Sequence, residues 1–392
     1  MALWVLKENL LLNRFNDIGH NRHIIPFLKR KRIDIEYYKG YEDFERMRQD
    51  PTSVLYFPSS LETEHINTVK LCNLHDIPVL CVDASLLHGV TDCYFSSISS
   101  SDQQSMPLLL SYCEQHGRHN LAFWGANPHY VDLHKIRTLY NSKENFTEED
   151  MFFLDDGFEG CFERFFENRH KYDAIICAND IYATFFIHKM QERDKDYLEK
   201  TFVISFMNTI LSQVMEYSIT SITYDRNILE SAVYDIYKSI NKHREHYDGI
   251  SITLKTTIFP RNSTRDLPFS KDYHISQFPF SKPPAKLPDP IKSNEPRGEN
   301  LGHSVDNILL VEQLLQSSDI NDLKIIYMFM EGYSNEETCS KLFLSLPTVK
   351  YRSSEMFRIV GVKNKKMFID LIEKFVDPAK LQEYIVNLSN EE

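Results

Sequence analysis

The stretch Tyr172–Asp180 reads YDAIICAND, and it sets the fold class of the chain. The run Ala174–Cys177 is apolar at every position, as expected of a strand that is buried on both faces. The segment Tyr182–Arg193 follows directly and has room for one helix. A buried strand followed by a helix is the repeating unit of a parallel sheet with right-handed crossovers.

The same unit recurs on both sides of this stretch. Further predicted strands are Ala2–Leu6, Ile33–Tyr37, Ser53–Phe57, Pro78–Val82, Asn120–Trp124 and Phe202–Phe206. Further predicted helices are His65–His75, Gln104–His116 and Phe158–Asn168. Seven strands over about 260 residues suit two α/β lobes better than one large sheet. The sequence therefore predicts an α/β fold of two lobes with parallel sheets.

Asp319–Val376 departs from this pattern and predicts four short helices. Ser334 precedes a glutamate by three positions, the spacing of a capping box, and Gly332 before it suits the end of the preceding helix. Ser345 and Pro347 mark another start, because proline fits the first turn of a helix. Two helices joined by a short turn, the second exposed and cationic, form a helix-turn-helix. The chain thus ends in a small all-α unit.

The second helix of this predicted motif, from Pro347 to about Val360, lies in a basic part of an acidic chain. Lys341–Lys366 holds seven Lys and Arg against one acid, Glu355, while the whole chain has a net charge of −12. Binding to DNA phosphates needs such local density rather than a basic protein. The alternative is an ordinary helical hairpin with a solvated basic face.

The order of caps, glycines and apolar positions resembles the LuxR-type (GerE-like) helix-turn-helix domain over about sixty residues. The matching positions are Gly332, Ser334, Asn335, Glu337, Leu342, Ser345, Thr348–Lys350, Gly361, Val362 and Asn364. In that family the second helix of the motif enters the major groove of double-stranded DNA. The resemblance implies that base edges are read by Lys350, Tyr351 and Ser354. It places Thr348, Arg352, Lys363 and Asn364 near phosphates, and Asn335 completes the predicted DNA-binding set.

Two apolar stripes leave the oligomeric state open. The LuxR-type family usually binds DNA as a dimer through its fourth helix, which here would be Lys366–Phe375. Its stripe of Met367, Phe368, Leu371, Ile372 and Phe375 is equally consistent with packing onto the other three helices. The predicted helix Val305–Leu315 also has an apolar stripe, which could be a dimer seam or a docking face. We expect a homodimer.

Arg265–Ser304 is predicted to be a linker, because it holds seven of the sixteen prolines. Such density prevents a continuous helix and favours an extended chain. The predicted domains are therefore 1–264, a two-lobed effector-binding domain, 265–304, a Pro-rich linker, and 305–392, the helix-turn-helix domain.

Six segments in order resemble the core of LacI-type regulators, which shares the periplasmic sugar-binding-protein fold. They are Val54–Ser60, Ile77–Asp83, His116–Gly125, Tyr172–Asp180, Ile219–Tyr224 and Ile258–Ser263. The resemblance implies two lobes that close on a small molecule, often a sugar, and that dimerise. It carries over Arg137 and Asn179 as ligand hydrogen-bonders, with Asp180 beside them.

Other predicted ligand contacts are less direct. Trp124 could stack on a sugar face or could be a core or hinge tryptophan. Asn208 and Tyr224 complete the predicted set, although the chain departs from the family there. Met207 stands in place of the usual ligand-holding carboxylate, and Tyr224 stands where a hinge glutamine is common. The pocket is therefore predicted to bind a less hydroxylated molecule, or to bind weakly, or to have lost its ligand.

The remaining features argue against catalysis and export. Glycine is sparse, with twelve in all, which argues against glycine-rich phosphate-binding loops. The serine-rich run Ser97–Ser101 lacks the elbow glycines of a serine hydrolase. We expect this run to be a loop. We expect no enzyme activity, no cofactor and no metal. The seven cysteines have no metal-binding spacing and several lie in apolar runs, which favours buried, reduced thiols in the cytoplasm. The N-terminal residues have no signal-peptide pattern, and no apolar run is long enough to span a membrane.

These patterns predict a cytoplasmic transcription regulator that binds double-stranded DNA and responds to a small, sugar-like effector. One alternative is a regulator with a silent cleft that a partner protein controls. Another is a cytosolic solute-binding protein whose tail is only an interaction module.

Overall fold

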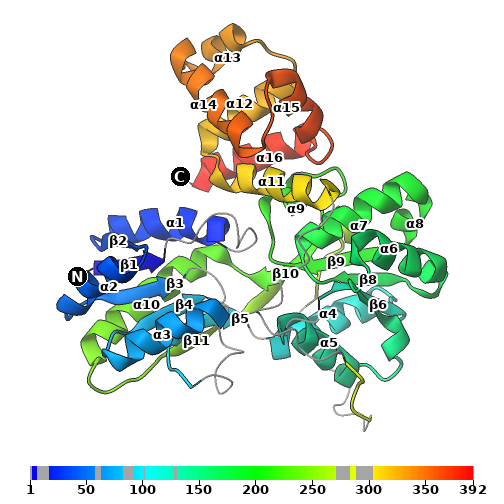
Figure 1. The fold of residues 1–392 in the computed structure, drawn as a ribbon. Helices are drawn as coiled ribbons and strands as arrows, with labels where there is room; N and C mark the ends of the chain where they lie inside the picture. The colour runs from blue at the N-terminus through cyan, green and yellow to red at the C-terminus, as the bar shows by residue number, and fades with distance from the viewer. Residues whose placement is uncertain are drawn as a thin grey trace. The chain divides into compact units, whose positions relative to one another are not determined.

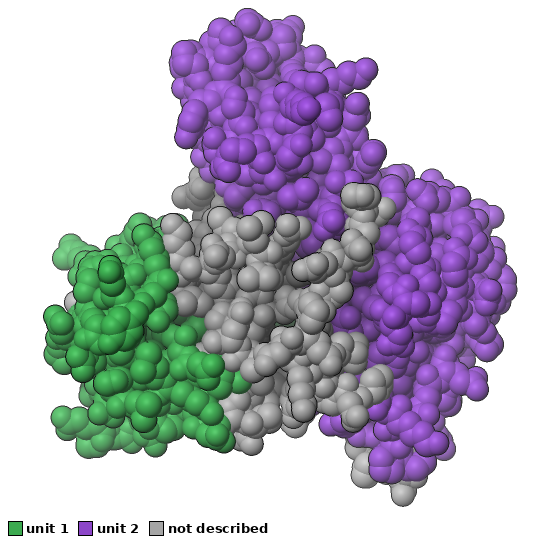
Figure 2. Space-filling model, in the orientation of Figure 1, with its two compact units in different colours: residues 1–105, 223–257, 290–297 green, residues 106–222, 258–289, 298–392 purple. Residues whose placement is uncertain are grey.

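The computed structural model describes residues 2–6, 17–57, 63–82, 92–100, 102–127, 130–270, 283–287 and 303–391. The chain divides into two units (Figure 2). The first unit holds residues 1–105, 223–257 and 290–297, and the second holds residues 106–222, 258–289 and 298–392. The chain passes from one unit to the other after Ser105, Ile222 and Thr257, so neither lobe is a continuous segment of the sequence.

The first unit is one lobe built on a sheet with the strand order β11-β5-β4-β3-β1-β2 (Figure 1). The strands are β1 (Ala2–Leu6), β2 (Asp34–Tyr38), β3 (Val54–Phe57), β4 (Val79–Val82), β5 (Ser96–Ser100) and β11 (Ser251–Leu254), and all neighbours run parallel. Its helices are α1 (Asp17–Arg30), α2 (Tyr41–Gln49), α3 (Thr63–Leu74) and α10 (Arg226–His243).

Alternation along the strands gives this lobe a core on each face of the sheet. Leu3 and Val5 of β1 pack in one apolar cluster with α1 and α10. Trp4, between them, packs in a second cluster with Phe44 of α2 and Val69 of α3. Both faces are buried, which is why the strands are apolar at successive positions.

The second unit begins with the other lobe, whose sheet has the order β12-β10-β9-β8-β6-β7. The strands are β6 (Leu121–Ala126), β7 (Met151–Phe153), β8 (Ala174–Cys177), β9 (Phe202–Phe206), β10 (Thr220–Tyr224) and β12 (Thr256–Phe259). The helices are α4 (Asp102–Gln115), α5 (Tyr130–Ser142), α6 (Gly157–Asn168), α7 (Asp180–Arg193), α8 (Lys195–Lys200) and α9 (Ile210–Val214). The strands β10, β9, β8, β6 and β7 pair in parallel.

Six further helices complete the second unit, and we call them the head. They are α11 (His303–Ser317), α12 (Ile320–Met330), α13 (Asn335–Leu342), α14 (Leu346–Ile359), α15 (Lys365–Ile372) and α16 (Pro378–Glu391). The side of the head formed by α11 and α16 contacts α9 of the second lobe, and α11 also contacts α7 (Figure 1). The sequence did not predict α16.

The predicted fold class is confirmed: two α/β lobes with parallel sheets are followed by a helical region. All seven predicted strands and the four predicted helices of the lobes are present within a few residues of their expected bounds. The four short helices predicted in Asp319–Val376 correspond to α12–α15.

The expectation of a loop at Ser97–Ser101 was wrong, because Ser96–Ser100 is strand β5 in the middle of a sheet. The serine hydroxyls are accommodated by the edge of neighbouring β11. The Ser97 and Ser251 hydroxyls lie 3.1 Å apart, and the Ser96 hydroxyl accepts the Ile250 N–H at 3.0 Å. Hydrogen-bonded hydroxyls can be buried at little cost, and this removes the usual objection to a polar central strand.

Only the two ends and a short middle piece of the predicted linker are described. Ser270 exchanges two hydrogen bonds with the Gln115 side chain of α4, at 3.0 and 3.2 Å. The Lys286 N–H donates to Glu148 at 2.6 Å. Residues 271–282 and 288–302, which include most of the predicted linker prolines, lie outside the described residues.

The seven cysteines are free thiols, and six of them are buried, as predicted for reduced cysteines in apolar runs. Burial raises the pKa of the Cys113 and Cys161 thiols to about 12. Such thiols stay protonated and unreactive at neutral pH. Among the residues that the structure describes, no helix combines the length and the apolarity that a membrane span requires.

Candidate nucleic-acid interface and ligand edge

Local capping signals build the helix-turn-helix of the head. Ser334 and Glu337 form the predicted capping box of α13, and Gly332 before it has the predicted positive φ, at 83°. The turn after α13 passes through Phe343 in the left-handed region, with φ at 56°. The Ser345 side chain then caps α14 by accepting the Thr348 N–H. Each helix end therefore has a residue that satisfies its free backbone groups.

The second helix of the motif, α14, has one buried and one exposed face. Val349, Ser353 and Met356 are buried against the other helices of the head. Ser353 is tolerated there because its hydroxyl donates to the Val349 carbonyl at 2.6 Å. The opposite face exposes Lys350, Tyr351, Ser354 and Arg358. The sequence spacing predicted these four exposed positions.

The predicted DNA-binding residues differ in how they are bonded. Lys350, Tyr351, Ser354, Lys363 and Asn364 are exposed, and Asn335 and Thr348 are partly exposed. Asn364 also has a structural role, since its side chain caps α15 by accepting the Met367 N–H at 2.9 Å.

Arg352 is half-buried and is bonded inside the head. Its Nη1 donates to Asp319 at 2.9 Å and to Asp322 at 2.7 Å, and these two carboxylates form the capping box of α12. This arginine therefore ties α14 to α12. A contact with a phosphate would have to compete with that pair.

Counting charges in the sequence overstates the charge available on the head. Of the seven cations in Lys341–Lys366, Arg358 pairs with Glu355, and Lys341 lies over the Tyr333 ring at 4.7 Å. Lys365 bonds the Tyr333 carbonyl and lies over Phe329, and burial lowers its pKa. In the described part of the chain, Lys350, Lys363 and Lys366 have no ion-pair partner. These three are the cations best placed to meet phosphates.

Both apolar stripes of uncertain purpose turn out to be packing surfaces. Phe368, Leu371, Ile372 and Phe375 are buried within the single chain, and the Phe357 and Phe368 rings lie 5.0 Å apart. Only Met367 of that stripe is exposed. On α11, Ile308, Leu309, Val311 and Leu315 are buried as well. The stripe of the fourth helix therefore packs onto the rest of the head, and the stripe of α11 is a docking face. Because these side chains are buried, neither stripe is free to form a dimer seam.

The ligand edge is the set of residues that follow β6, β8 and β9 in the second lobe. Ligands of open α/β sheets bind outside the carboxyl ends of the strands, and here Asn127, Asn179 and Asn208 lie just beyond those ends. The Asn179 side chain caps α7 by accepting the Tyr182 N–H at 2.9 Å. The Asn208 side chain accepts a hydrogen bond from the Arg261 guanidinium.

Asp180 is fully buried, and its side chain accepts hydrogen bonds from within the second lobe. It accepts hydrogen bonds from the Ser205 and Ser221 hydroxyls, the latter at 2.7 Å. It also accepts the Thr209 N–H at 2.6 Å and the Thr209 hydroxyl at 3.0 Å. These bonds join the start of α7 to β9, β10 and the N-cap of α9, so Asp180 holds the edge together rather than presenting a carboxylate to solvent.

The two predicted aromatic contacts are core residues. Trp124 is fully buried, with its ring stacked on Phe185 at 6.1 Å and tilted against Phe186 at 5.1 Å. Of the two alternatives for Trp124, the structure supports a core tryptophan and not a ring exposed for stacking on a sugar. Tyr224 is buried in the apolar cluster of the first lobe that includes α10. Neither ring is available at a surface of the unit that contains it.

Lys135, which the sequence analysis did not single out, lies near the ligand edge. The Lys135 Nζ donates to the Ala178 carbonyl at 3.2 Å and lies 4.5 Å from the Phe206 ring centroid, so it reaches the ends of β8 and β9. Arg137 is exposed on α5. Two positions along a helix differ by about 200°, so Arg137 lies on the opposite flank of α5. The sequence signal for Lys135 is its i, i+3 spacing from Asp132, which accepts the Asn127 N–H at 3.0 Å.

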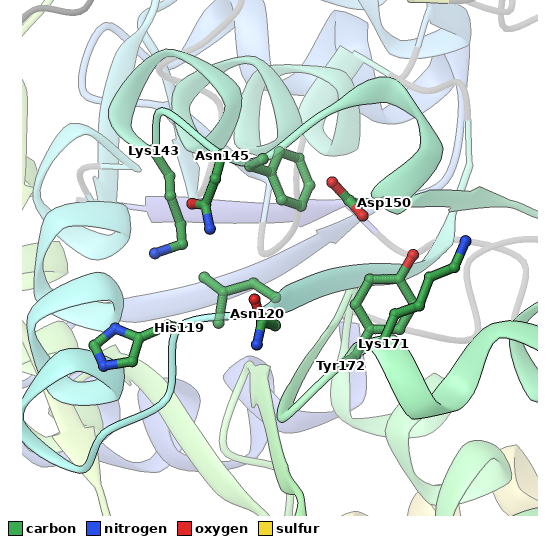
Figure 3. Close-up of a pocket in the computed structure, with 9 residues that line it drawn as sticks. His119, Asn120, Lys143, Asn145, Asp150, Lys171 and Tyr172 are labelled. Carbon is green, nitrogen blue, oxygen red and sulfur yellow. The ribbon is translucent and has the colours of Figure 1, made fainter.

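A cavity of about 210 Å³ lies at the other end of the same sheet, where β6 and β8 begin (Figure 3). Lys143 and Lys171 stand on opposite sides of it, with Asn120 between them. Asp150, on its wall, is bonded to the Thr147 N–H and hydroxyl. This cavity lies at the amino ends of the strands and is therefore separate from the ligand edge.

No family model and no curated protein matches the sequence. Solved structures do match. The Lac repressor dimer bound to operator and the anti-inducer ONPF aligns with a TM-score of 0.51 and 14% identity, over 67% of this chain and 81% of that one. A transcriptional regulator CelR–cellobiose complex gives 0.51 and 11%, over 67% and 84%. A regulatory protein of the LacI family from Chloroflexus aggregans gives 0.53 and 12%, over 67% and 98%. The chain thus has the two-lobed fold of LacI-type regulators.

Proposed function

We propose that this protein is a cytoplasmic transcription regulator, with a LuxR-type head that binds double-stranded DNA and a two-lobed domain that senses a small, sugar-like effector. The observation that carries the proposal is the exposed face of α14, where Lys350, Tyr351 and Ser354 lie together on a well-capped helix. Lys363 follows the same helix and has a free ammonium. Side chains of this kind reach base edges and phosphates when a helix enters the major groove.

Selection of DNA from a random duplex pool, followed by gel shifts, tests the head. The native chain should select a sequence, and Lys350→Ala should reduce its preference over random DNA by about tenfold, as expected for one lost base contact. Lys374→Ala is the matched control, because Lys374 lies on the side of the head that faces the second lobe. Loss of selectivity in the control but not in Lys350→Ala would reject α14 as the reading helix. No selective binding by the native chain would favour a solute-binding protein with an interaction tail.

For the effector, we propose binding at the ligand edge, with Lys135, Asn127 and the predicted Asn179 as polar contacts, and with the predicted Arg137, on the other flank of α5, as the alternative cation. A cation beside an amide is suited to hydroxyl or carboxylate oxygens of a metabolite. The fold neighbours include a regulator solved with cellobiose, so a panel of mono- and disaccharides is the first choice. Calorimetry of the native chain, Lys135→Ala and Arg137→Ala separates the two cations. A ligand lost only in Arg137→Ala would show that the flank of α5 away from Lys135 forms the site.

One observation favours the second candidate, a regulator with a silent cleft under the control of a partner protein. The residues that the LacI-type resemblance implies for the ligand are largely committed elsewhere, with Asp180 fully buried and Asn208 bonded to Arg261. Absence of heat across a broad sugar panel, together with selective DNA binding, would support this candidate over the first.

A further inference from the structure

A buried carboxylate of the head reaches into the second lobe. Glu312 of α11 is only 8% exposed. Its two oxygens accept the backbone N–H groups of Ile210 at 3.1 Å and Leu211 at 2.7 Å, the first two residues of α9. The Gln316 amide donates to the same carboxylate at 2.5 Å. A buried charge is tolerated when it is hydrogen-bonded, and here two of the bonds come from the second lobe.

The far end of α9 is also held by the head. The Asp377 N–H, at the start of α16, donates to the Val214 carbonyl at 2.8 Å. Between these ends, Ile210, Leu211, Ser212 and Val214 are all buried. The helix therefore has head contacts at both termini, although it belongs to the fold of the lobe.

The same helix starts at the ligand edge. Thr209, its N-cap, is bonded through both its N–H and its hydroxyl to Asp180, the first residue of α7. The carboxylates of Asp180, on the lobe side, and Glu312, on the head side, therefore bind consecutive residues, Thr209 and Ile210. The start of α9 is thus clamped between two buried acids of different domains.

The turn that leads into α9 is strained. Met207 has φ at 97° and Asn208 has φ at 55°, and neither is glycine. Residues with side chains adopt such angles at a cost and keep them only where surrounding contacts impose them. Here the imposing contacts are the Asp180 bonds to Thr209 and the Ser221 hydroxyl, which accepts the Asn208 N–H at 3.2 Å. A group held in strain can relax when one of these contacts changes.

We propose that α9 is a coupling element between the ligand edge and the head, with Glu312 as the positioning residue that fixes the head to it. A rearrangement at Met207–Asn208 moves Thr209, and through Thr209 the N–H groups that Glu312 holds. The head therefore moves with the second lobe as one body, because it is attached through the α9 contacts and not only through the predicted linker. A regulatory role for this coupling rests on the proposed function, since it assumes DNA bound at the head and an effector or partner bound at the ligand edge. The mechanical coupling between α9 and the head does not depend on the proposed function.

The test measures coupling without DNA or effector. Native-state hydrogen exchange of the full chain is compared among the native protein, Glu312→Gln, Thr209→Val and the double variant, with Glu383→Gln, at an exposed position of α16, as the charge-matched control. Glu312→Gln should raise exchange of the Ile210 and Leu211 amides by about tenfold or more, since hydrogen bonds to a charged group are lost. Thr209→Val should raise exchange within α11, in the other domain. The double variant should raise exchange less than the product of the two single effects.

The proposal is overturned if Thr209→Val leaves α11 as protected as in the native chain, or if the two effects multiply independently. Should Glu312→Gln fold poorly, Glu312→Asp keeps the charge with a shorter reach and gives the same comparison. Gel shifts on the same variants keep the two ideas apart. Absence of selective DNA binding in the native chain would reject the proposed function while the exchange coupling stands. Coupling absent with DNA binding intact would reject only the role of α9.

Discussion

The head and the ligand edge of the second lobe were both predicted from residue patterns, and they differ in what the predicted residues do. On α14, Lys350, Tyr351 and Ser354 are exposed, and in the described part of the chain the side chains of Lys350 and Tyr351 have no hydrogen bond. At the ligand edge, Asp180 is buried and Asn179 and Asn208 are engaged within the lobe. The comparison shows that the exposed face of a helix can be predicted from helical spacing, whereas polar side chains at the end of a strand are also used to hold the sheet and its helices together.

The largest expected effect tests the structural role of Asp180. Asp180→Ala would leave the Ser205 and Ser221 hydroxyls and the Thr209 N–H without their buried acceptor. Because each unsatisfied buried polar group costs about 1–3 kcal/mol, the free energy of unfolding should fall by about 3 kcal/mol or more. Urea unfolding followed by tryptophan fluorescence measures it, since Trp124 is in the core of that lobe.

Asp196→Ala, at an exposed position of α8, is the control and should change stability by less than about 0.5 kcal/mol. A loss below about 1 kcal/mol in Asp180→Ala would contradict the structural assignment and return Asp180 to the set of ligand contacts.

A smaller effect is expected from the one predicted DNA contact that is bonded inside the head. Arg352→Ala removes hydrogen bonds to Asp319 and Asp322, and because the arginine is partly exposed we expect a loss of about 1 kcal/mol in stability. Lys350→Ala, two positions earlier and fully on the surface, should be neutral for stability. Thermal unfolding of the two variants makes the comparison, and equal melting temperatures would show that the Arg352 pairs contribute nothing.

What the sequence could predict follows the same division. Seven strands of the lobes and helices α11–α15 of the head were predictable because each depends on neighbours in the chain: apolar runs, the Ser334 capping box and the Ser345–Pro347 start. β5 was missed because its serines become acceptable only through bonds to β11, which lies about 150 residues away in the chain. The burial of Trp124 and the flank on which Arg137 lies depend on packing in the same way. The position of Lys135 beside the ends of β8 and β9 depends on packing as well, and the family resemblance pointed only to Arg137.

A still smaller effect distinguishes free from bonded lysines on the head. Lys363→Ala should weaken binding to all DNA sequences, and the slope of log affinity against log salt should fall in magnitude by about 0.9, one phosphate contact. Lys365→Ala is the matched comparison, because Lys365 bonds the Tyr333 carbonyl and lies over Phe329. Its salt slope should be unchanged. Equal slopes in both variants would contradict the assignment of Lys363 as a phosphate contact and of Lys365 as a lysine bonded inside the head.

The smallest effect concerns pH and the pair that joins α12 to α14. Burial raises the pKa of the Asp319 carboxyl, but hydrogen bonds from the Asp322 N–H and from Arg352 outweigh it, so the pKa lies below its usual 3.8. A carboxyl with a lowered pKa stabilises the fold above its unfolded-state pKa and loses that contribution as the pH falls through the folded value. Because Asp319 is half-exposed, the contribution is below about 1 kcal/mol. The stability difference between the native chain and Asp319→Asn should therefore be constant from pH 7 to pH 5 and should shrink below about pH 4. Urea unfolding at each pH measures it, and a difference that grows on acidification would contradict the sign of the shift.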